Sequence, residues 1–303
     1  MNEIKQNSPY AWFLAARPKT LTGAIIPVLL GSALAFSDGQ FKTAPALLCA
    51  LFACGMQIAA NFINDLFDFQ KGTDRREDRL GPQRACAEGW ITPAAMKTGI
   101  GIALTLSCLA GLAVLFTVWG QLPHGGWELV VPGVVCILFA FLYTTLLSYR
   151  GWGDVLVLVF FGFVPVCGTY YVQAYTLNMD VVVLSLVSGL AIDTLLMVNN
   201  YRDREQDAVS GKCTLVVRYG KKFGENMYLA LGIAAVLLCF WFVYTGKLTP
   251  LEFIWAPCVY LYMHALTWRK MIQIGSGKKL NSILGETSRN MLFLGLLLAV
   301  ALN

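Results

Sequence analysis

The sequence predicts an all-α membrane protein with about nine transmembrane helices, and three observations support this class. Of its 303 residues, 57% are hydrophobic and only 14% are charged, whereas soluble domains are roughly 25% charged. The apolar residues form long blocks, and the polar residues collect between those blocks instead of following amphipathic periods. A helix that spans a bilayer needs about 20 mostly apolar residues. We therefore expect one transmembrane domain over residues 1–303, in contact with membrane lipid.

Nine apolar blocks qualify as candidate spans. In chain order they are Leu21–Phe36, Ala44–Phe62, Ala94–Trp119, Leu129–Leu147, Val155–Tyr175, Val181–Val198, Met227–Thr245, Phe253–Trp268 and Asn290–Leu302. The first and last blocks are short for a bilayer. The first would be long enough if it began near Trp12, and the last if it began near Thr287, so eight spans are the alternative to nine.

The distribution of basic residues orients these spans. With nine spans, all of the 23 Lys and Arg residues except Lys42 and Lys247 fall on the side of the N-terminus. The positive-inside rule makes that side the cytoplasm. Because the basic residues are divided among short loops, the net charge of +5 does not indicate nucleic-acid binding. The nine cysteines lie mostly inside apolar blocks without a CxxC pair, so we expect no disulfide or zinc framework.

Two clusters of Asp and Asn lie where spans end on the cytoplasmic side. The first contains Asn61, Asp65 and Asp68, whose spacing of four and three residues predicts one shared helix face. The second repeats the pattern every four residues, at Asn199, Asp203 and Asp207. The matched pattern indicates a weak internal duplication. The clusters begin two Asp-rich cytoplasmic loops, residues 64–93 and 199–224.

The chemistry of these clusters suits a diphosphate bound through Mg²⁺. Facing carboxylates repel unless a cation lies between them, and Mg²⁺ is typically held by one or two carboxylates together with phosphate oxygens and water. The metal would neutralise charge as a diphosphate leaves. Nearby basic side chains would add donors to the phosphate oxygens; they are Lys71, Arg79, Arg84, Arg202 and Lys212. A single Asp-rich loop is usually only solvated surface, but two matched clusters favour binding.

A few polar residues inside the apolar blocks are candidates for binding a second substrate. Asp193 lies within a span, where an ionisable group is costly and usually functional; the alternative is a protonated Asp that bonds between helices. Gln57 and Tyr143 would orient an aromatic substrate or simply bond between helices. Asp154 either caps the helix that it opens or faces a cavity.

Several stretches of the sequence resemble the UbiA-type intramembrane aromatic prenyltransferases, and among them the branch that acts on 1,4-dihydroxy-2-naphthoate. The stretches are NDLFDFQKGTDRREDRLGPQRACAEGWITPAAM (64–96), GDVLVLVFFG (153–162), NNYRDREQDAVSGKCTLVVRYG (199–220) and LNSILGETSRNM (280–291). They extend from the second span to the last. The KGTD…RLGPQR and SGKCTLVVRYG segments are more specific than the Asp motifs, and they favour the naphthoate branch over the hydroxybenzoate branch.

The resemblance implies nine helices around a central cavity that cytoplasmic loops cap, in a bacterial cytoplasmic (inner) membrane. It also implies Mg²⁺-dependent transfer of a polyprenyl group from polyprenyl diphosphate to the naphthoate ring, with loss of CO₂ and formation of demethylmenaquinone. Asn64, Asp65, Asp68 and Asp74 match the first motif, and Asn200, Asp203 and Asp207 match the second. The spacing from Asp68 to Asp74 is longer than the Asp-xxx-Asp of the hydroxybenzoate enzymes.

These expectations define the candidate site. Its catalytic residues are Asp65, Asp68, Asp203 and Asp207, and its metal ligands are those four together with Asn61, Asn64, Asp74, Asn199 and Asn200. One alternative is the same chemistry on another acceptor, 4-hydroxybenzoate or homogentisate. Another is a transporter with Asp193 as its ion site, although transporter sites usually lie near the bilayer midplane and these carboxylates gather at its edge.

Overall fold

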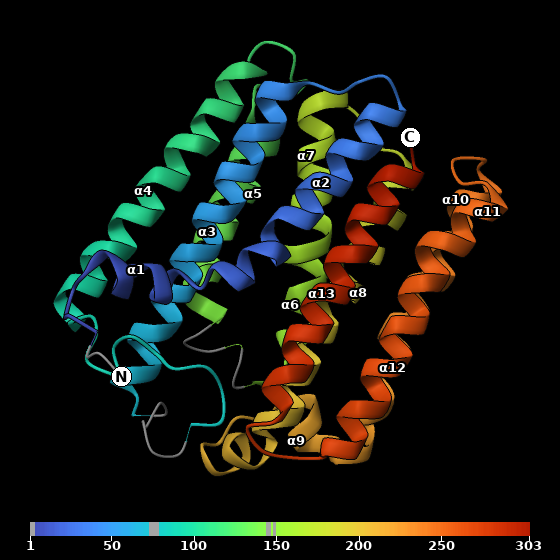
Figure 1. Cartoon of the computed structure of the whole chain (residues 1–303). Coiled ribbons are helices and arrows are strands. Elements are labelled where there is room, and N and C mark those ends of the chain that lie inside the picture. Colours follow the sequence, from blue (N-terminus) through green and yellow to red (C-terminus); the bar gives the residue numbers. More distant parts are fainter. Residues whose placement is uncertain (1–3, 73–78, 144–146, 148–149) are drawn as a thin grey trace.

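The computed structural model describes residues 4–72, 79–143, 147 and 150–303, and within these ranges the chain forms helices and no β-strand. Long helices run side by side through the molecule (Figure 1). The N-terminus lies at the end that carries α9, and the C-terminus lies at the other end (Figure 1). An odd number of crossings, as predicted, places the termini in this way.

The helices of the first half correspond to the first five predicted spans. They are α1 (Pro9–Ala16), the short η1 (Pro18–Thr20), α2 (Leu21–Ser37), α3 (Thr43–Gln70), α4 (Pro93–Thr117), α5 (Trp127–Leu142), α6 (Gly153–Leu158), the π-helix η4 (Val159–Phe163) and α7 (Val164–Ala174). The second half contains α8 (Met179–Val209), α9 (Leu215–Tyr219), α10 (Lys221–Tyr244), α11 (Pro250–Phe253), the π-helix η5 (Ile254–Cys258), α12 (Val259–Ile274) and α13 (Leu280–Ala301).

Where the structure describes them, the predicted spans fall on helices, but the structure does not establish the count of nine. Within the described residues, seven helical segments are long and apolar enough to cross a membrane. Helix α5 is apolar but has only 16 residues, and the segment from α11 to α12 is not among the seven. The chain is therefore an all-helical protein with seven or more apolar helices of membrane-spanning character.

One predicted boundary was wrong and another was confirmed. The last helix begins at Leu280, ten residues before the predicted Asn290, because its polar first turns bury one face through Leu280, Ile283 and Thr287. The first span begins at Leu21 as predicted, and together with α1 it forms one apolar segment, Pro9–Ser37, that is long enough to cross a membrane. Arg17 takes a left-handed conformation with φ 51° and separates α1 from α2, which a residue other than glycine adopts only at some cost.

Among the described residues the helices pack around four hydrophobic clusters, and two of them contain most of the buried side chains. One is built mainly from α2, α7, α8, α10 and α13, and the other from α1, α3, α4 and the segment at residues 85–91. The backbones of η4 and α8 come unusually close: a Cβ atom at Gly162 would lie 2.5 Å from the Ser185 carbonyl oxygen. The Ser188 hydroxyl donates to the Phe161 carbonyl at 3.0 Å, which satisfies a backbone group within the π-helix.

A polar network ties the helices together at the end opposite the Asp clusters. The Asp38 carboxylate accepts hydrogen bonds from Lys247 and, at 2.6 Å, from the Tyr170 hydroxyl. Burial alone would raise the pKa of Asp38, but these hydrogen bonds outweigh it and lower the pKa below its usual value. Lys42 donates to the Gln173 carbonyl at 2.7 Å and lies 3.8 Å from the Tyr175 ring centroid. Both basic residues predicted on this side therefore have specific partners.

Candidate functional site

A large cavity of about 1660 Å³ lies within the helix bundle. Its wall at one end carries Asn and Asp side chains of α3 and α8, together with Arg and Lys side chains. Most of the remaining wall is apolar and comes from α3, α4, α5, η4 and α7. The cavity therefore joins a polar compartment to an apolar one, as an amphipathic ligand requires.

Helix α3 supplies the first part of the polar compartment. Gln57, Ala60, Asn64 and Asp68 line the cavity, and their spacing of three or four residues is that of one helix face. The Asp68 carboxylate forms an ion pair with Arg84 at 3.1 Å. The helix continues to Gln70, so the first Asp motif is held on a rigid element and not on a loop.

Asn61 and Asp65, which sequence spacing placed on the ligand-binding face, do not line the cavity. Both carboxylate oxygens of Asp65 accept backbone hydrogen bonds, from Ala85 at 2.8 Å and from Cys86 at 2.9 Å. The Asn61 amide donates to the Ala16 carbonyl at 3.0 Å and to the Thr20 hydroxyl at 2.9 Å. Asp65 thus anchors the segment that carries Arg84, and Asn61 anchors the start of α2.

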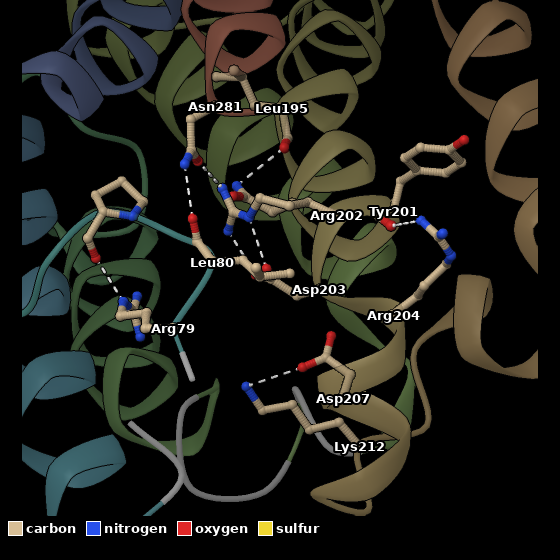
Figure 2. A network of polar contacts seen from close by, with 12 residues as sticks. Arg79, Leu80, Leu195, Tyr201, Arg202, Asp203, Arg204, Asp207, Lys212 and Asn281 are labelled. Atoms are coloured by element: carbon tan, nitrogen blue, oxygen red, sulfur yellow. Dashed lines mark hydrogen bonds and ion pairs between the residues drawn. The ribbon is translucent and has the colours of Figure 1, made fainter. Parts of the chain in front are cut away.

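Helix α8 brings the whole second cluster into the cavity. Asn199, Asn200, Asp203 and Asp207 all line it. Arg202 binds the Asp203 carboxylate through two hydrogen bonds of 2.7 and 2.6 Å (Figure 2). This bidentate geometry is characteristic of strong Arg–carboxylate pairs.

Arg202 also connects α8 to two other parts of the chain. It donates to the Asn281 side-chain oxygen at 2.8 Å, and the Asn281 amide donates to the Leu80 carbonyl at 2.8 Å (Figure 2). Gly81 permits this contact, because a Cβ atom there would lie 2.9 Å from the Arg202 guanidinium. The segment at residues 79–82 is therefore fastened over the second cluster by α13.

The third cavity carboxylate, Asp207, has Lys212 at 3.8 Å (Figure 2). Each of the three carboxylates is thus paired with a basic side chain that sequence analysis assigned to phosphate. Arg79 also lines the cavity and donates to the Pro82 carbonyl at 2.6 Å. Burial and the nearby Arg84 lower the pKa of Arg79 to about 9, as expected where cations are crowded.

Other predicted site residues divide between the cavity and its surroundings. Tyr143 lines both the main cavity and a small side pocket that also contains Asp154. Asp193 lies behind the cavity wall, buried between helices, and lines neither space. Lys71 is exposed and does not line the cavity. Asp74 lies outside the described residues.

Sequence analysis missed three basic residues and one amide residue that line the cavity. They are Arg17, Lys19, Asn281 and Arg289. The Arg17 guanidinium contains a buried nitrogen, Nη2, that has no hydrogen-bond partner among the described residues. A buried donor of this kind is costly unless a ligand satisfies it. The only sequence signal was a pair of basic residues, Arg17 and Lys19, between two apolar segments.

The donor set fits Mg²⁺ when a phosphate ligand completes the shell. The cavity presents amide and carboxylate oxygens at Asn64, Asp68, Asn200, Asp203 and Asp207, which are the hard ligands that Mg²⁺ prefers. Across the part of the chain that the structure describes, no three His, Cys, Asp or Glu side chains are close enough to bind a metal by themselves.

Residues 24–282 match the UbiA prenyltransferase family. The chain belongs to this family. The 1,4-dihydroxy-2-naphthoate octaprenyltransferase of Escherichia coli K12 is 37% identical over 79% of this chain and 78% of its own length. The enzyme of the same name from Mycobacterium leprae is 34% identical over 96% of both chains. The family resemblance of the four sequence stretches is therefore confirmed, and the chain is an integral membrane prenyltransferase of the UbiA family.

Two solved UbiA homologues share the fold. One from Aeropyrum pernix superimposes with a TM-score of 0.68 at 15% identity, over 94% of this chain and 97% of its own. Another, from Archaeoglobus fulgidus and solved with GPP and Mg²⁺, gives 0.65 at 12% identity, over 96% and 99%. At such low identity these UbiA structures establish the architecture alone.

Proposed function

We propose that the protein transfers a polyprenyl group from polyprenyl diphosphate to 1,4-dihydroxy-2-naphthoate, with loss of the ring carboxylate as CO₂, in a reaction that depends on Mg²⁺. The observation that carries this proposal is the cavity itself. Three carboxylates paired with three cations stand at one end of a long apolar space. This arrangement matches a ligand with a diphosphate head and an isoprenoid tail. The names of the relatives support the choice of naphthoate as acceptor.

The diphosphate would be held at the two Asp clusters. Bound Mg²⁺ supplies Lewis acidity that neutralises charge on the leaving diphosphate. Its protein ligands would come from the oxygens of six residues that line the cavity; they are Asn64, Asp68, Asn199, Asn200, Asp203 and Asp207. Asp74 remains a candidate from sequence alone.

The cations of the site would exchange partners when substrate binds. Arg84, Arg202 and Lys212 neutralise the carboxylates in this structure. With metal at the carboxylates, their N–H groups become free to bind phosphate oxygens, Arg in a planar fork and Lys as a point charge. Arg79 and Arg17 lie in the same cavity; an anion there would pair with both charges and would accept from the buried Nη2 of Arg17.

The transfer itself needs few protein groups. The allylic C–O bond breaks and its electron pair leaves with the diphosphate, and the naphthoate ring carbon then bonds to the prenyl cation as the carboxylate leaves as CO₂. Gln57 and Tyr143 line the cavity and are placed to orient the ring. The apolar wall excludes water, which would otherwise trap the cation.

The orientation of the protein in the membrane is part of the same proposal. The basic residues crowd at the end that carries the Asp clusters, so the positive-inside rule places this end and the N-terminus in the cytoplasm of a bacterial inner membrane. The chain would then be one transmembrane domain whose loops 64–93 and 199–224 cover the cavity. A water-soluble aromatic acid reaches the site from this side while the isoprenoid tail stays in lipid.

The test uses purified protein in liposomes with octaprenyl diphosphate and 1,4-dihydroxy-2-naphthoate. The wild type should form prenylated, decarboxylated product, and Asp203→Asn should lower kcat/KM about 100-fold, the usual cost of losing a group that stabilises developing charge. Glu205→Gln, on the same helix but with a side chain 78% exposed, is the matched control and should match the wild type. Uptake of the acid into liposomes without product would support a transporter and contradict the proposal.

A further inference from the structure

A small side pocket of about 70 Å³ lies beside the polar compartment of the main cavity. The two spaces adjoin, because they share five lining residues; these are Tyr143, Leu196, Asn200, Asp207 and Lys212. Four other residues line the side pocket alone; these are Gly151, Gly153, Asp154 and Thr214. A cavity that binds benzene measures about 150 Å³, so the side pocket can accept a small polar group of a ligand but not a ring.

Asp154 is the acidic residue that belongs to the side pocket alone. It lies in the first turn of α6 and is only 7% exposed. Its Oδ1 atom is buried and has no hydrogen-bond partner in the part of the chain that the structure describes. A buried acceptor of this kind is costly unless a ligand or an ordered water donates to it. Asp154 thus offers an acceptor that the proposed metal and diphosphate site does not use.

Two glycines shape the side pocket. A Cβ atom at Gly153 would lie 3.1 Å from Leu196 and 4.0 Å from the Tyr143 hydroxyl oxygen, so a side chain there would take up space between them. Gly151 has a left-handed conformation with φ 77°, which glycine adopts without strain, and a Cβ atom there would lie 2.7 Å from the Cys213 carbonyl oxygen. The turn before α6 can therefore pack against the segment that follows α8. This contact closes the pocket on one side and leaves its interior open.

The chemistry of the two proposed substrates decides which group can enter this pocket. The oxygens of a diphosphate and of a ring carboxylate accept hydrogen bonds, so next to Asp154 they would leave its Oδ1 atom unsatisfied. The two ring hydroxyls of 1,4-dihydroxy-2-naphthoate are the O–H donors that these substrates offer. The hydroxyl at C1 is adjacent to the ring carboxylate and can donate to it within the molecule. The hydroxyl at C4 has no such neighbour, so it is available to a protein acceptor.

We propose that the side pocket receives the C4 hydroxyl of 1,4-dihydroxy-2-naphthoate, which donates a hydrogen bond to Oδ1 of Asp154. This inference rests on the proposed function and names the part of the acceptor that the site recognises. Tyr143 lines both spaces, so a ring beside Tyr143 in the main cavity can reach the side pocket with one substituent. Asp154 then selects a 1,4-diol over a monohydroxy acid, because an acid without the C4 hydroxyl leaves this carboxyl oxygen without a partner.

The test compares two acids that differ only by this hydroxyl. Purified protein in liposomes with octaprenyl diphosphate and Mg²⁺ is assayed for transfer to 1,4-dihydroxy-2-naphthoate, and 1-hydroxy-2-naphthoate is added as a competing ligand. The wild type should bind the monohydroxy acid about tenfold or more weakly than the diol. Asp154→Ala should lower kcat/KM for the diol by about tenfold or more. The inhibition constant of 1-hydroxy-2-naphthoate should change by less than about twofold, because this acid has no hydrogen bond to Asp154 to lose.

Two further variants serve as controls. Asp154→Asn keeps the size of the side chain and an oxygen that can accept from the hydroxyl, so its kcat/KM for the diol should lie between those of the wild type and Asp154→Ala. This variant also carries the test if Asp154→Ala does not fold. Asp193 is buried and likewise has an Oδ1 atom without a partner among the described residues, but it lines neither space. Asp193→Asn should therefore leave the discrimination between the two acids unchanged.

Four results would separate the claims. Equal binding of the two acids by the wild type would overturn the role of the C4 hydroxyl. An equal loss with both acids in Asp154→Ala and Asp154→Asn would also overturn the proposal, because Asp154 would then only support the fold. A raised Mg²⁺ requirement with unchanged discrimination would assign Asp154 to the metal instead. Absence of transfer to the diol by the wild type would refute the proposed function itself.

Discussion

Asp65 and Asp68 belong to one sequence motif, but they have different surroundings in the structure, and we expect substitution by Asn to have different effects at the two positions. Asp65 is buried and accepts two backbone hydrogen bonds from Ala85 and Cys86. Asp68 faces the cavity and pairs with Arg84. We expect Asp65→Asn to act mainly on stability and Asp68→Asn mainly on the response to Mg²⁺.

The magnitude follows from the hydrogen bonds. A hydrogen bond to a charged group contributes about 1.5–3 kcal/mol, and Asn presents an NH₂ group to one of the two backbone N–H donors. Asp65→Asn should therefore lower the free energy of unfolding by about 3 kcal/mol. Asp68→Asn keeps a side-chain oxygen that can still accept from Arg84, so it should lower the free energy of unfolding by less than Asp65→Asn does, while the Mg²⁺ concentration for half-maximal transfer rises.

The assay combines thermal unfolding of purified protein in detergent with Mg²⁺ titrations of prenyl transfer. An Asp65→Asn protein with wild-type unfolding and a raised Mg²⁺ requirement would refute the reasoning, because Asp65 would then act as a ligand. An Asp68→Asn protein with an unchanged Mg²⁺ requirement would refute the proposed role of Asp68 in binding Mg²⁺.

Three further predictions follow from the same contacts. Arg202→Lys keeps the positive charge but loses the planar guanidinium that binds both Asp203 and Asn281, so kcat/KM for transfer should fall by about 10–100-fold. Arg204→Lys is the control, because Arg204 is on the same helix but does not line the cavity, and this variant should match the wild type. Chelation of Mg²⁺ should abolish prenyl transfer and added Mg²⁺ should restore it; transfer that persists in a chelator would contradict the proposed metal role. The pKa of Asp38 is lower in the folded protein than in the unfolded chain. Ionised Asp38 therefore stabilises the fold above about pH 4, the ordinary pKa of Asp, and this stabilisation is lost as the pH falls through the lower pKa of the folded state. The unfolding temperature of Asp38→Asn should therefore differ from that of the wild type at neutral pH and converge with it in acid, and a constant difference would contradict this account.

Hydropathy predicted the helices well, because the length of an apolar block in a bilayer protein is set by the membrane. Hydropathy failed where polar and apolar residues alternate within one helix. The first turns of α13 carry Asn281 and Glu286 among apolar residues and looked like a loop, yet Leu280 and Ile283 bury one face there. The sequence also did not predict the left-handed backbone conformation of Arg17, because arginine has no preference for it.

The candidate site was predicted in composition but only partly in geometry. The spacing of α3 allows two overlapping faces, Asn61–Asp65–Asp68 and Ala60–Asn64–Asp68, and only the partner segment at residues 84–86 decides between them. The spacing of residues within one helix does not predict which distant segment packs against it. The same limit explains why Arg17 and Asn281 were missed, because each reaches the site from an element far away in the chain.

The most direct test of the central claim is a competition between acceptors. Purified protein in liposomes receives octaprenyl diphosphate, Mg²⁺ and equal amounts of 1,4-dihydroxy-2-naphthoate and 4-hydroxybenzoate, with the naphthoate carboxyl group labelled. We predict a prenylated naphthalene product and the release of one labelled CO₂ for each diphosphate formed. A prenylated hydroxybenzoate as the main product, or prenylation with the label retained in the ring product, would contradict the proposed reaction.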